Sequence, residues 1–277
     1  TRFADVVRRR WFAAKRVDRM TITSPSIAIL AGGLATRLGA VTKARPKSLV
    51  DIAGRPFLAW QLELLHRQGI DDVVLCVGHL GEQIQAVVAG LAPDGMRVQF
   101  SFDGPERRGT GGALLHALPL LSEPFLVMYG DSYLQCEYRA VFERLVSAAK
   151  AGEAEGSDPP LGVMTVYCND DQFDSSNVLF ERDRVVRYSK TDMSRAMRHI
   201  DWGLGALSHA AFAPFSSRTE FDLAELYEAL VRSGQLLAHE VDTRFYEVGS
   251  PDGLRGPTMP ASSPALPCAL ARNAPCG

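Results

Sequence analysis

The sequence predicts an α/β fold built on a Rossmann-like, mostly parallel mixed sheet with helices on both faces. Three observations support this prediction: short apolar runs alternate with segments of helical spacing, several of these runs end in glycine, and the chain is large enough for a substantial core. Of the 277 residues, 46% are hydrophobic and 22% are charged, which is an ordinary globular composition. No apolar run is long enough to cross a bilayer, so no membrane partner is expected.

The alternation is clearest in the first half of the chain. Strands are predicted at 27–30, 73–77, 98–102 and 125–129, and helices at 56–68, 82–91, 112–118 and 139–150. Because ligands bind at the carboxyl ends of the strands in such sheets, we expect the turns after residues 30, 77 and 129 to form one binding edge.

The pattern changes after a polar loop at 152–160. The second half is predicted to hold a strand at 161–168, a hairpin at 177–188 that turns near Asp183, a short apolar segment at 204–207, a helix at 222–234 capped by Asp222, and a last strand at 245–248. We expect this half to extend the same sheet and to cover one side of the binding edge.

Charge and cysteine content exclude several classes of protein. The net charge of −2 gives no electrostatic reason to expect a nucleic-acid partner. The five cysteines are scattered and form no C-x-x-C pair, so reduced thiols and a cytoplasmic protein are predicted rather than a disulfide framework or a zinc site. Cys76 and Cys168 lie in apolar runs and are predicted to be small core residues. The sequence does not decide between a monomer and a homo-oligomer.

The main chemical signal is a glycine-rich turn directly after the first strand. L-A-G-G-L-A-T-R-L occupies residues 30–38, and Pro46-Lys47 follows. Such a turn lets backbone N–H groups approach phosphate oxygens. The Arg37 guanidinium is a forked donor suited to phosphate, and Lys47 adds a compact positive charge. The G-K-[ST] ending of a P-loop is absent. The pattern therefore predicts a site that stabilises negative charge on phosphates.

This run resembles the signature of the sugar-phosphate nucleotidyltransferase family, G-G-x-G-T-R-L followed by P-K. Ala35 stands where glycine is usual, and Ala40 where proline is often found. The likeness extends from Ile27 to about Leu254. It implies an enzyme that uses Mg²⁺ to join a sugar 1-phosphate to a nucleoside triphosphate, which yields a nucleotide-sugar and pyrophosphate.

The resemblance also implies roles for individual residues. Catalysis is assigned to Arg37, Lys47 and Asp131. The metal is assigned to Asp131, at the end of a strand, and to Glu247, which stands where aspartate is commoner. The sugar phosphate is assigned to Lys190, Asp201 and Gly203. The implied nucleotide-binding residues are Leu30, Ala31, Gly32, Gly33, Thr36, Gly78, Gly109, Thr110 and Gly111.

Three regions are expected along the chain. Residues 1–24 are predicted to be an N-terminal extension, residues 25–255 the nucleotidyltransferase domain, and residues 256–277 an unstructured tail. Within the domain, the nucleotide-binding half is expected to reach to about residue 150 and the sugar-phosphate-binding half to begin after about residue 160.

The short length and the segments T-G-G-A at 110–113, I-D-W-G at 200–203 and E-V-G-S-P at 247–251 look most like guanylyltransferases for heptose or mannose 1-phosphate. A uridylyltransferase for an N-acetylated amino-sugar phosphate and a cytidylyltransferase for a small phospho-alcohol stay open. A non-catalytic, nucleotide-sugar-binding regulatory subunit would be expected to lose Arg37, Lys47 and Asp131, which are present. A glycosyltransferase would be expected to show an Asp-x-Asp pair, and residues 131–133 do not form one.

Overall fold

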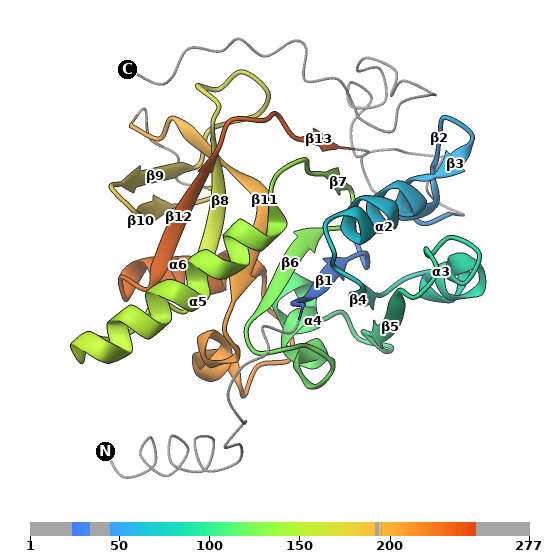
Figure 1. The fold of residues 1–277 in the computed structure, drawn as a ribbon, viewed down its shortest axis with the longest axis horizontal. Coiled ribbons are helices and arrows are strands. Elements are labelled where there is room, and N and C mark those ends of the chain that lie inside the picture. The colour runs from blue at the N-terminus through green and yellow to red at the C-terminus, as the bar shows by residue number, and fades with distance from the viewer. Residues whose placement is uncertain (1–23, 34–44, 192–193, 195, 248–277) are drawn as a thin grey trace.

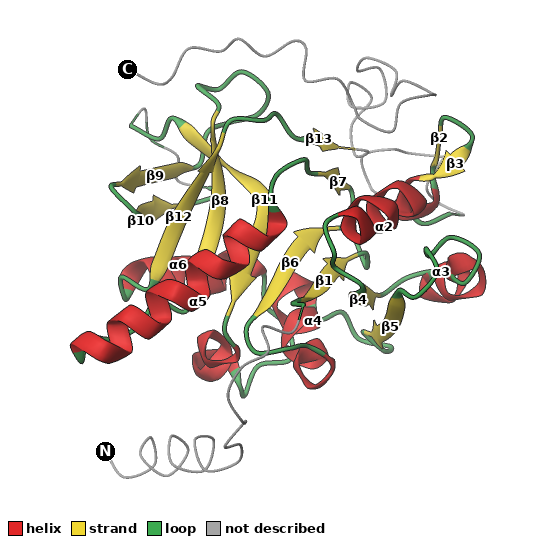
Figure 2. Ribbon diagram, viewed as in Figure 1, coloured by secondary structure: helices red, strands yellow, loops and turns green. Residues whose placement is uncertain are grey.

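A nine-stranded mixed sheet runs through the computed structural model, which describes residues 24–33, 45–191, 194 and 196–247 (Figure 1). The strand order is β5-β4-β1-β6-β11-β8-β12-β10-β9, and helices lie on both faces (Figure 2). The predicted fold class is therefore confirmed.

The first half of the chain forms the parallel part of the sheet. β1 pairs in parallel with β4 and with β6, and β4 pairs in parallel with β5. The predicted strand at 125–129 has these bounds in the structure, whereas the predicted helix at 112–118 begins three residues earlier, at Gly109. The elements are β1 (Ser26–Leu30), η2 (Lys47–Leu49), β2 (Asp51–Ile52), β3 (Arg55–Pro56), α2 (Phe57–Arg67), β4 (Asp72–Val77), α3 (Gly81–Val88), β5 (Arg97–Phe102), α4 (Gly109–Ala117), η3 (Leu118–Leu120) and β6 (Phe125–Tyr129).

The second half extends the same sheet, as predicted. β11 joins the two halves because it pairs antiparallel with β6 on one side and with β8 on the other. The elements are β7 (Ser132–Tyr133), α5 (Tyr138–Glu155), β8 (Gly162–Cys168), β9 (Val178–Glu181), β10 (Arg184–Tyr188), β11 (His199–Leu207), η4 (His209–Phe215), α6 (Leu223–Arg232), β12 (Leu236–Val241) and β13 (Tyr246–Glu247).

Three elements of this half differ from the predictions. The apolar segment at 204–207 is only the end of β11, whose two glycines weaken the strand pattern in the sequence. β12 was not predicted because a histidine and a glutamate interrupt its apolar residues. Helix α5 continues into the predicted 152–160 loop and ends at Gly156, which has a left-handed φ of 68°.

Two apolar cores lie on the two faces of the sheet. Alternate residues of β1 serve both cores: Ile27 and Ile29 belong to the core beneath α2, α3 and α5, and Ala28 belongs to the core beneath α4 and α6. All three are fully buried. Because neighbouring residues of β1 are buried on opposite faces, the strand reads as a continuous apolar run, which is typical of a parallel sheet.

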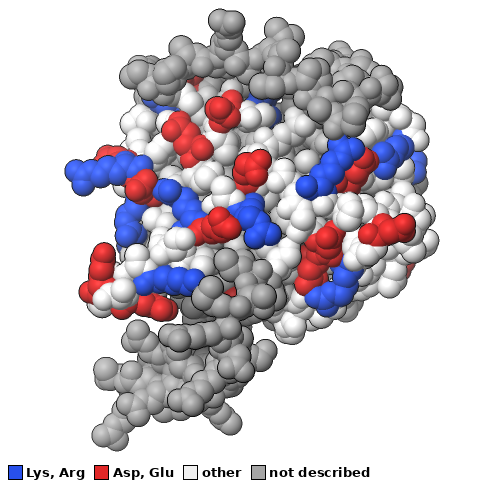
Figure 3. Space-filling model, viewed as in Figure 1, with Lys and Arg blue, Asp and Glu red and all other residues white. Residues whose placement is uncertain are grey.

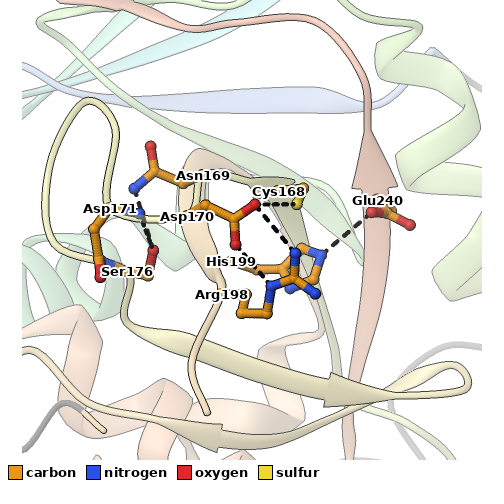
Figure 4. A network of polar contacts seen from close by, with 8 residues as sticks. All are labelled: Cys168, Asn169, Asp170, Asp171, Ser176, Arg198, His199 and Glu240. Atoms are coloured by element: carbon orange, nitrogen blue, oxygen red, sulfur yellow. Dashed lines mark hydrogen bonds and ion pairs between the residues drawn. The ribbon is translucent and has the colours of Figure 1, made fainter. Parts of the chain in front are cut away.

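A polar network holds the outer end of the second half (Figure 4). Asp170 accepts hydrogen bonds from Nε of Arg198 at 2.7 Å and from its Nη2 at 3.3 Å, and this contact lowers the pKa of the Asp170 carboxyl. His199 Nε2 lies 3.3 Å from Glu240 Oε1, which links β11 to β12. The network thereby connects the loop after β8 to the strands beside it.

The cysteine prediction is partly corrected. Cys76 is a free thiol with 1% exposure, so it is the core residue that was predicted, and Cys136 is also free. Cys168 is only half-buried at the end of β8 and is disulfide-bonded, so the predictions of a reduced thiol and of a core position were both wrong for this residue.

The surface shows no segregation of charge on the face seen in Figure 3, where Lys and Arg side chains are interspersed with Asp and Glu. Among the described residues, no helix combines the length and the apolar character needed to cross a membrane.

Helix α4 packs unusually close to the segment that precedes α6. The N–H groups of Gly111 and Gly112 both point to the carbonyl oxygen of Phe221, at 2.9 and 3.2 Å. A Cβ atom at Gly112 would lie 2.4 Å from the carbonyl oxygen of Thr219. Glycine at this position is therefore a requirement of packing.

We expect Gly112→Ala to destabilise the protein. Alanine favours a helix interior by about 1 kcal/mol over glycine, but overpacking against a fixed backbone costs about 1–3 kcal/mol, so the clash should dominate. Urea unfolding would measure the change. Gly90→Ala is the control, because its Cβ would meet nothing closer than Val87 O at 3.6 Å, and it should alter stability by less than about 0.5 kcal/mol. An unchanged free energy of unfolding for Gly112→Ala would contradict this account of the packing.

Candidate functional site

A cleft of about 730 Å³ opens where β5, β4, β1 and β6 end side by side. The carboxyl ends of these parallel strands meet at one edge of the sheet, which is where such folds bind ligands. Thr36 and Arg37 lie outside the described residues, and Gly111, Lys190, Asp201 and Gly203 are not in the lining. The predicted residues that line the cleft are Leu30, Ala31, Gly32, Gly33, Lys47, Gly78, Gly109, Thr110 and Asp131.

The glycine turn after β1 is held against its neighbouring loops. The N–H of Ala31 donates to the carbonyl oxygen of Cys76 at 2.9 Å. A Cβ atom at Gly32 would lie 2.9 Å from the backbone nitrogen of Gly78, so glycine is required there by contact between the two loops. A Cβ at Gly33 would meet no described atom within 4 Å. Packing against the described residues therefore does not require glycine at position 33, which also lines the cleft.

Lys47 and Asp131 form an ion pair at one end of the cleft. Lys47 Nζ lies 3.3 Å from Asp131 Oδ2, and the two side chains are 20% and 33% exposed. Lys47 begins the short helix η2, whereas Asp131 follows β6 across Gly130. The pair places a cation and a carboxylate where both can reach a phosphate or a divalent ion.

The strand β13 brings the backbone of Glu247 close to this ion pair. It pairs antiparallel with β7, and Glu247 is in register with Ser132, the residue after Asp131. The described residues contain no group of three or more Asp, Glu, His or Cys side chains that could hold a metal. Mg²⁺ usually takes only one or two protein carboxylates, so the Asp131 carboxylate in the cleft and the backbone position of Glu247 fit such an ion.

The segment at 109–112 has a second role besides lining the cleft. Thr110 Oγ1 accepts a hydrogen bond from the N–H of Leu223 at 2.8 Å, and a Cβ at Gly111 would lie 2.3 Å from the ring of Phe221. The small residues of this segment thus allow the start of α6 to dock on the start of α4. This contact keeps Gly111 out of the cleft lining.

The residues predicted to hold the sugar phosphate lie together beside Tyr129, which lines the cleft. Lys190 Nζ is 3.3 Å from Asp222 Oδ1 and 6.0 Å from the centre of the Tyr129 ring. Asp201 Oδ1 accepts the N–H of Gly203 at 3.0 Å. Burial raises the pKa of Asp201 to about 6, while the Gly203 N–H and the charge of Lys190 act in the opposite direction.

Among the lining residues that sequence reasoning missed, two polar ones stand at strand ends. Asp103 directly follows β5, and Tyr129 is the last residue of β6. The hydroxyl of Tyr129 is buried and has no hydrogen-bond partner among the described residues. The sequence does contain a signal for Asp103, since it is an acid at the carboxyl end of a predicted strand. The sequence does not show that β5 lies beside β4, which is what brings Asp103 to the cleft.

The fold and the cleft define an α/β protein with a cleft at the carboxyl edge of its sheet, lined in part by a glycine turn and a lysine–aspartate ion pair. The family model described as a MobA-like NTP transferase domain matches residues 27–169, which is more than half of the chain. The chain belongs to this family.

The chain is also similar to two curated relatives and to one solved structure. It is 29% identical over 236 residues to the mannose-1-phosphate guanylyltransferase catalytic subunit beta of Xenopus tropicalis; the match covers 83% of this chain and 63% of that protein. It is 27% identical over 225 residues to the D-glycero-alpha-D-manno-heptose 1-phosphate guanylyltransferase of Campylobacter jejuni, covering 81% and 94%.

The solved structure is HddC from Yersinia pseudotuberculosis complexed with GMP-PN. It superposes with a TM-score of 0.66 at 24% identity, over 83% of this chain and 96% of that one. At this level of identity the likeness confirms the fold.

We expect the stability contribution of Asp201 to depend on pH. Its folded pKa of about 6 exceeds its ordinary value of 3.8, so the folded protein binds this proton more tightly than the unfolded chain does. Asp201 therefore favours the folded state increasingly as the pH falls from about 6 to about 4. The isosteric Asp201→Asn variant lacks this titration.

Stability curves at two pH values would test this expectation. The Asp201→Asn variant should gain stability relative to the wild-type protein on going from about pH 4 to about pH 7. A difference between the two proteins that stays constant over this range would show that the folded state does not perturb the carboxyl.

Proposed function

We propose that this chain is a sugar-1-phosphate nucleotidyltransferase, and that its substrates are GTP and heptose or mannose 1-phosphate. One observation carries the reaction class: the cleft brings the glycine turn, Lys47 and Asp131 together at the carboxyl edge of the sheet. Family membership and the names of the two guanylyltransferase relatives support the choice of reaction and of base.

The proposed reaction is a single displacement. An oxygen of the sugar 1-phosphate attacks the α-phosphorus of GTP, the bond from this phosphorus to the bridging oxygen breaks, and pyrophosphate leaves. We assign Lys47 to the charge on the α-phosphoryl group, which its ion pair with Asp131 in the cleft supports, and the backbone of the glycine turn at Gly32 and Gly33 to phosphate oxygens. Arg37, in the segment after Gly33, is assigned to the pyrophosphate.

Mg²⁺ held by Asp131 and Glu247 would supply further neutralisation of the phosphates. The chain's own contribution is to orient the reactants. Lys190 is assigned to the attacking phosphate, because it lies over Tyr129 at the border between the cleft and the second half of the sheet. No nucleophilic side chain is needed, since the sugar phosphate is itself the nucleophile.

A uridylyltransferase for an amino-sugar 1-phosphate is the alternative within this reaction class. The nucleotide substrates of the two candidate enzymes differ only in their base, so one assay distinguishes the two candidates. Pyrophosphate release should be measured with each of the four common nucleoside triphosphates against heptose, mannose and N-acetylated amino-sugar 1-phosphates. Release with GTP and a manno-configured substrate supports the proposal. Nucleotide binding with no release in any combination would favour a regulatory subunit.

We expect Asp131→Asn to reduce turnover by orders of magnitude while the protein stays folded. The amide keeps the size of the side chain but loses the charge that binds a divalent ion. Turnover should be measured over a range of Mg²⁺ concentrations and in excess chelator. Asp94→Asn, in the exposed loop before β5, is the matched control and should behave as the wild-type protein does. Full activity in excess chelator would contradict the metal assignment.

Lys190→Ala should raise the KM for the sugar phosphate more than the KM for the triphosphate. A hydrogen bond to a charged group contributes about 1.5–3 kcal/mol, which corresponds to roughly ten- to a hundred-fold in affinity. The lower end is expected here, because phosphate must first displace Asp222 from Lys190. Steady-state kinetics with both substrates varied would measure the two constants.

Lys150→Ala, on the exposed side of α5, is the control for this experiment. An equal rise in both KM values would place Lys190 at the α-phosphate instead. Unchanged values would make it a surface lysine.

A further inference from the structure

Asp131 lies in a short turn, Gly130-Asp131, that joins β6 to β7. Tyr129 is the last residue of β6, and Ser132 is the first residue of β7. Because only two residues separate these strands, the peptide groups of Tyr129 and Ser132 determine the direction in which the Asp131 side chain leaves the backbone. A group that binds both of their carbonyl oxygens therefore controls where the Asp131 carboxylate lies.

The side chain of Gln61 makes these two contacts. Gln61 lies in the middle of α2 and is fully buried. Its Nε2 donates to the carbonyl oxygen of Ser132 at 2.9 Å and to that of Tyr129 at 3.4 Å. The N–H of Gly130 donates to the carbonyl oxygen of Leu30 at 3.0 Å. The turn is thus held by the amide of Gln61 and by the end of β1.

Helix α2 also holds the segment that carries Lys47. The N–H of Phe57 donates to the carbonyl oxygen of Val50 at 2.8 Å, and the N–H of Val50 donates to that of Lys47 at 3.0 Å. Phe57 and Gln61 are one helical turn apart, so they lie on the same face of α2. Both partners of the Lys47–Asp131 ion pair, which are 84 residues apart, are therefore attached to neighbouring turns of one helix.

Packing alone does not explain a glutamine at this position. The other fully buried residues on the same part of α2 are apolar, among them Leu58, Leu62 and Leu65. The Oε1 atom of Gln61 is buried and has no hydrogen-bond partner among the residues that the structure describes. Burial of an unpaired polar atom is unfavourable, so an apolar side chain of this size would suit the core equally well. What only the amide supplies is an N–H donor for the turn.

We propose that Gln61 is a positioning residue that holds the Asp131 carboxylate in place for a divalent ion. It acts through the Gly130-Asp131 turn and touches neither the ion nor the substrates. Ser132 is also in register with Glu247, so the same hydrogen bond orients the strand beside the second assigned ligand. The inference rests on the proposed function for the metal at Asp131. Loss of a hydrogen bond that orients a metal ligand typically costs about ten- to a hundred-fold in metal affinity or activity.

The Gln61→Met variant tests this inference, because methionine keeps the length of the unbranched side chain and removes the donor. Binding of Mn²⁺ alone would be measured by electron paramagnetic resonance, which detects the free ion. We expect the Mn²⁺ affinity to fall about tenfold or more. The urea midpoint should change little, because the lost bond to Ser132 and the removal of the unpaired Oε1 have opposite effects. Gln85→Met, on the exposed side of α3, is the control and should leave both quantities unchanged.

The Gln61→Glu variant is a conservative replacement that can restore the bond. Burial favours the neutral form of a carboxyl, whose hydroxyl can donate to the carbonyl oxygen of Ser132 in place of the amide. We expect Gln61→Glu to recover most of the Mn²⁺ affinity that Gln61→Met loses. If Gln61→Met does not fold, near-normal Mn²⁺ affinity of Gln61→Glu supports the inference, and a loss as large as that of Asp131→Asn contradicts it.

Steady-state kinetics give a further readout that a purely structural role would not produce. In Gln61→Met the kcat should fall and the Mg²⁺ concentration for half-maximal activity should rise. The KM for the sugar phosphate should stay unchanged, because that substrate is assigned to Lys190. A rise in this KM with normal dependence on Mg²⁺ would overturn the inference.

Two binding results would also overturn it. Unchanged Mn²⁺ affinity in a folded Gln61→Met protein would make Gln61 an ordinary core residue. Equal losses in Gln61→Met and Gln61→Glu would show that the donor is not what matters. Asp131→Asn separates these results from failure of the proposed function. If Asp131→Asn binds Mn²⁺ as the wild-type protein does, the metal assignment itself is wrong, and the inference fails with it.

Discussion

The parallel pairing of β1 with β4 on one side and with β6 on the other is the constraint on which the site depends. It aligns the carboxyl ends of these strands, and two short backbone contacts then hold the loops that follow. Ala31 donates to Cys76 O at 2.9 Å, and Gly130 donates to Leu30 O at 3.0 Å. A shift of β1 by one residue would exchange the side chains that are buried on its two faces. Packing in both cores therefore fixes the register of β1 and, with it, the position of the glycine turn.

Both lysines of the site are held by carboxylates. Lys47 pairs with Asp131 and Lys190 pairs with Asp222, each at 3.3 Å. A phosphate that binds either lysine must displace a carboxylate or share the lysine with it. The binding energy therefore reflects a difference between two ion pairs rather than a full charge-assisted bond. This arrangement favours ligands whose charge is concentrated, as it is on phosphate groups.

The two halves of the chain meet in the short segment that starts α6. Asp222 caps this helix with its side chain and also pairs with Lys190, while the N–H of Leu223 bonds to Thr110 in the cleft lining. Lys190, which is assigned to the sugar phosphate, thus contacts Asp222, and Thr110, which lines the cleft, contacts the next residue, Leu223. The packing of Gly109, Gly111 and Gly112 against this segment explains why small residues occur there.

Local patterns made much of the fold predictable. The strands at the centre of the sheet were recognised because residues buried on both faces form uninterrupted apolar runs, as in β6. Helix α6 was recognised from its amphipathic spacing, and Asp222 does form the predicted N-cap. β12 was missed because its pattern is broken by charge, although a parallel neighbour on one side and β10 on the other hold it in the sheet.

The sequence by itself determined which residues are candidates for phosphate chemistry, because the glycine turn, Lys47 and Asp131 are recognisable from residue type and from their position in the predicted elements. Only the tertiary structure decided which of them meet. Asp131 and Lys47 are 84 residues apart, and their contact depends on strand pairing that local periodicity does not encode. The same is true of Asp103, an ordinary acid in the sequence, which becomes a half-buried carboxylate of the cleft because β5 lies beside β4 in the sheet.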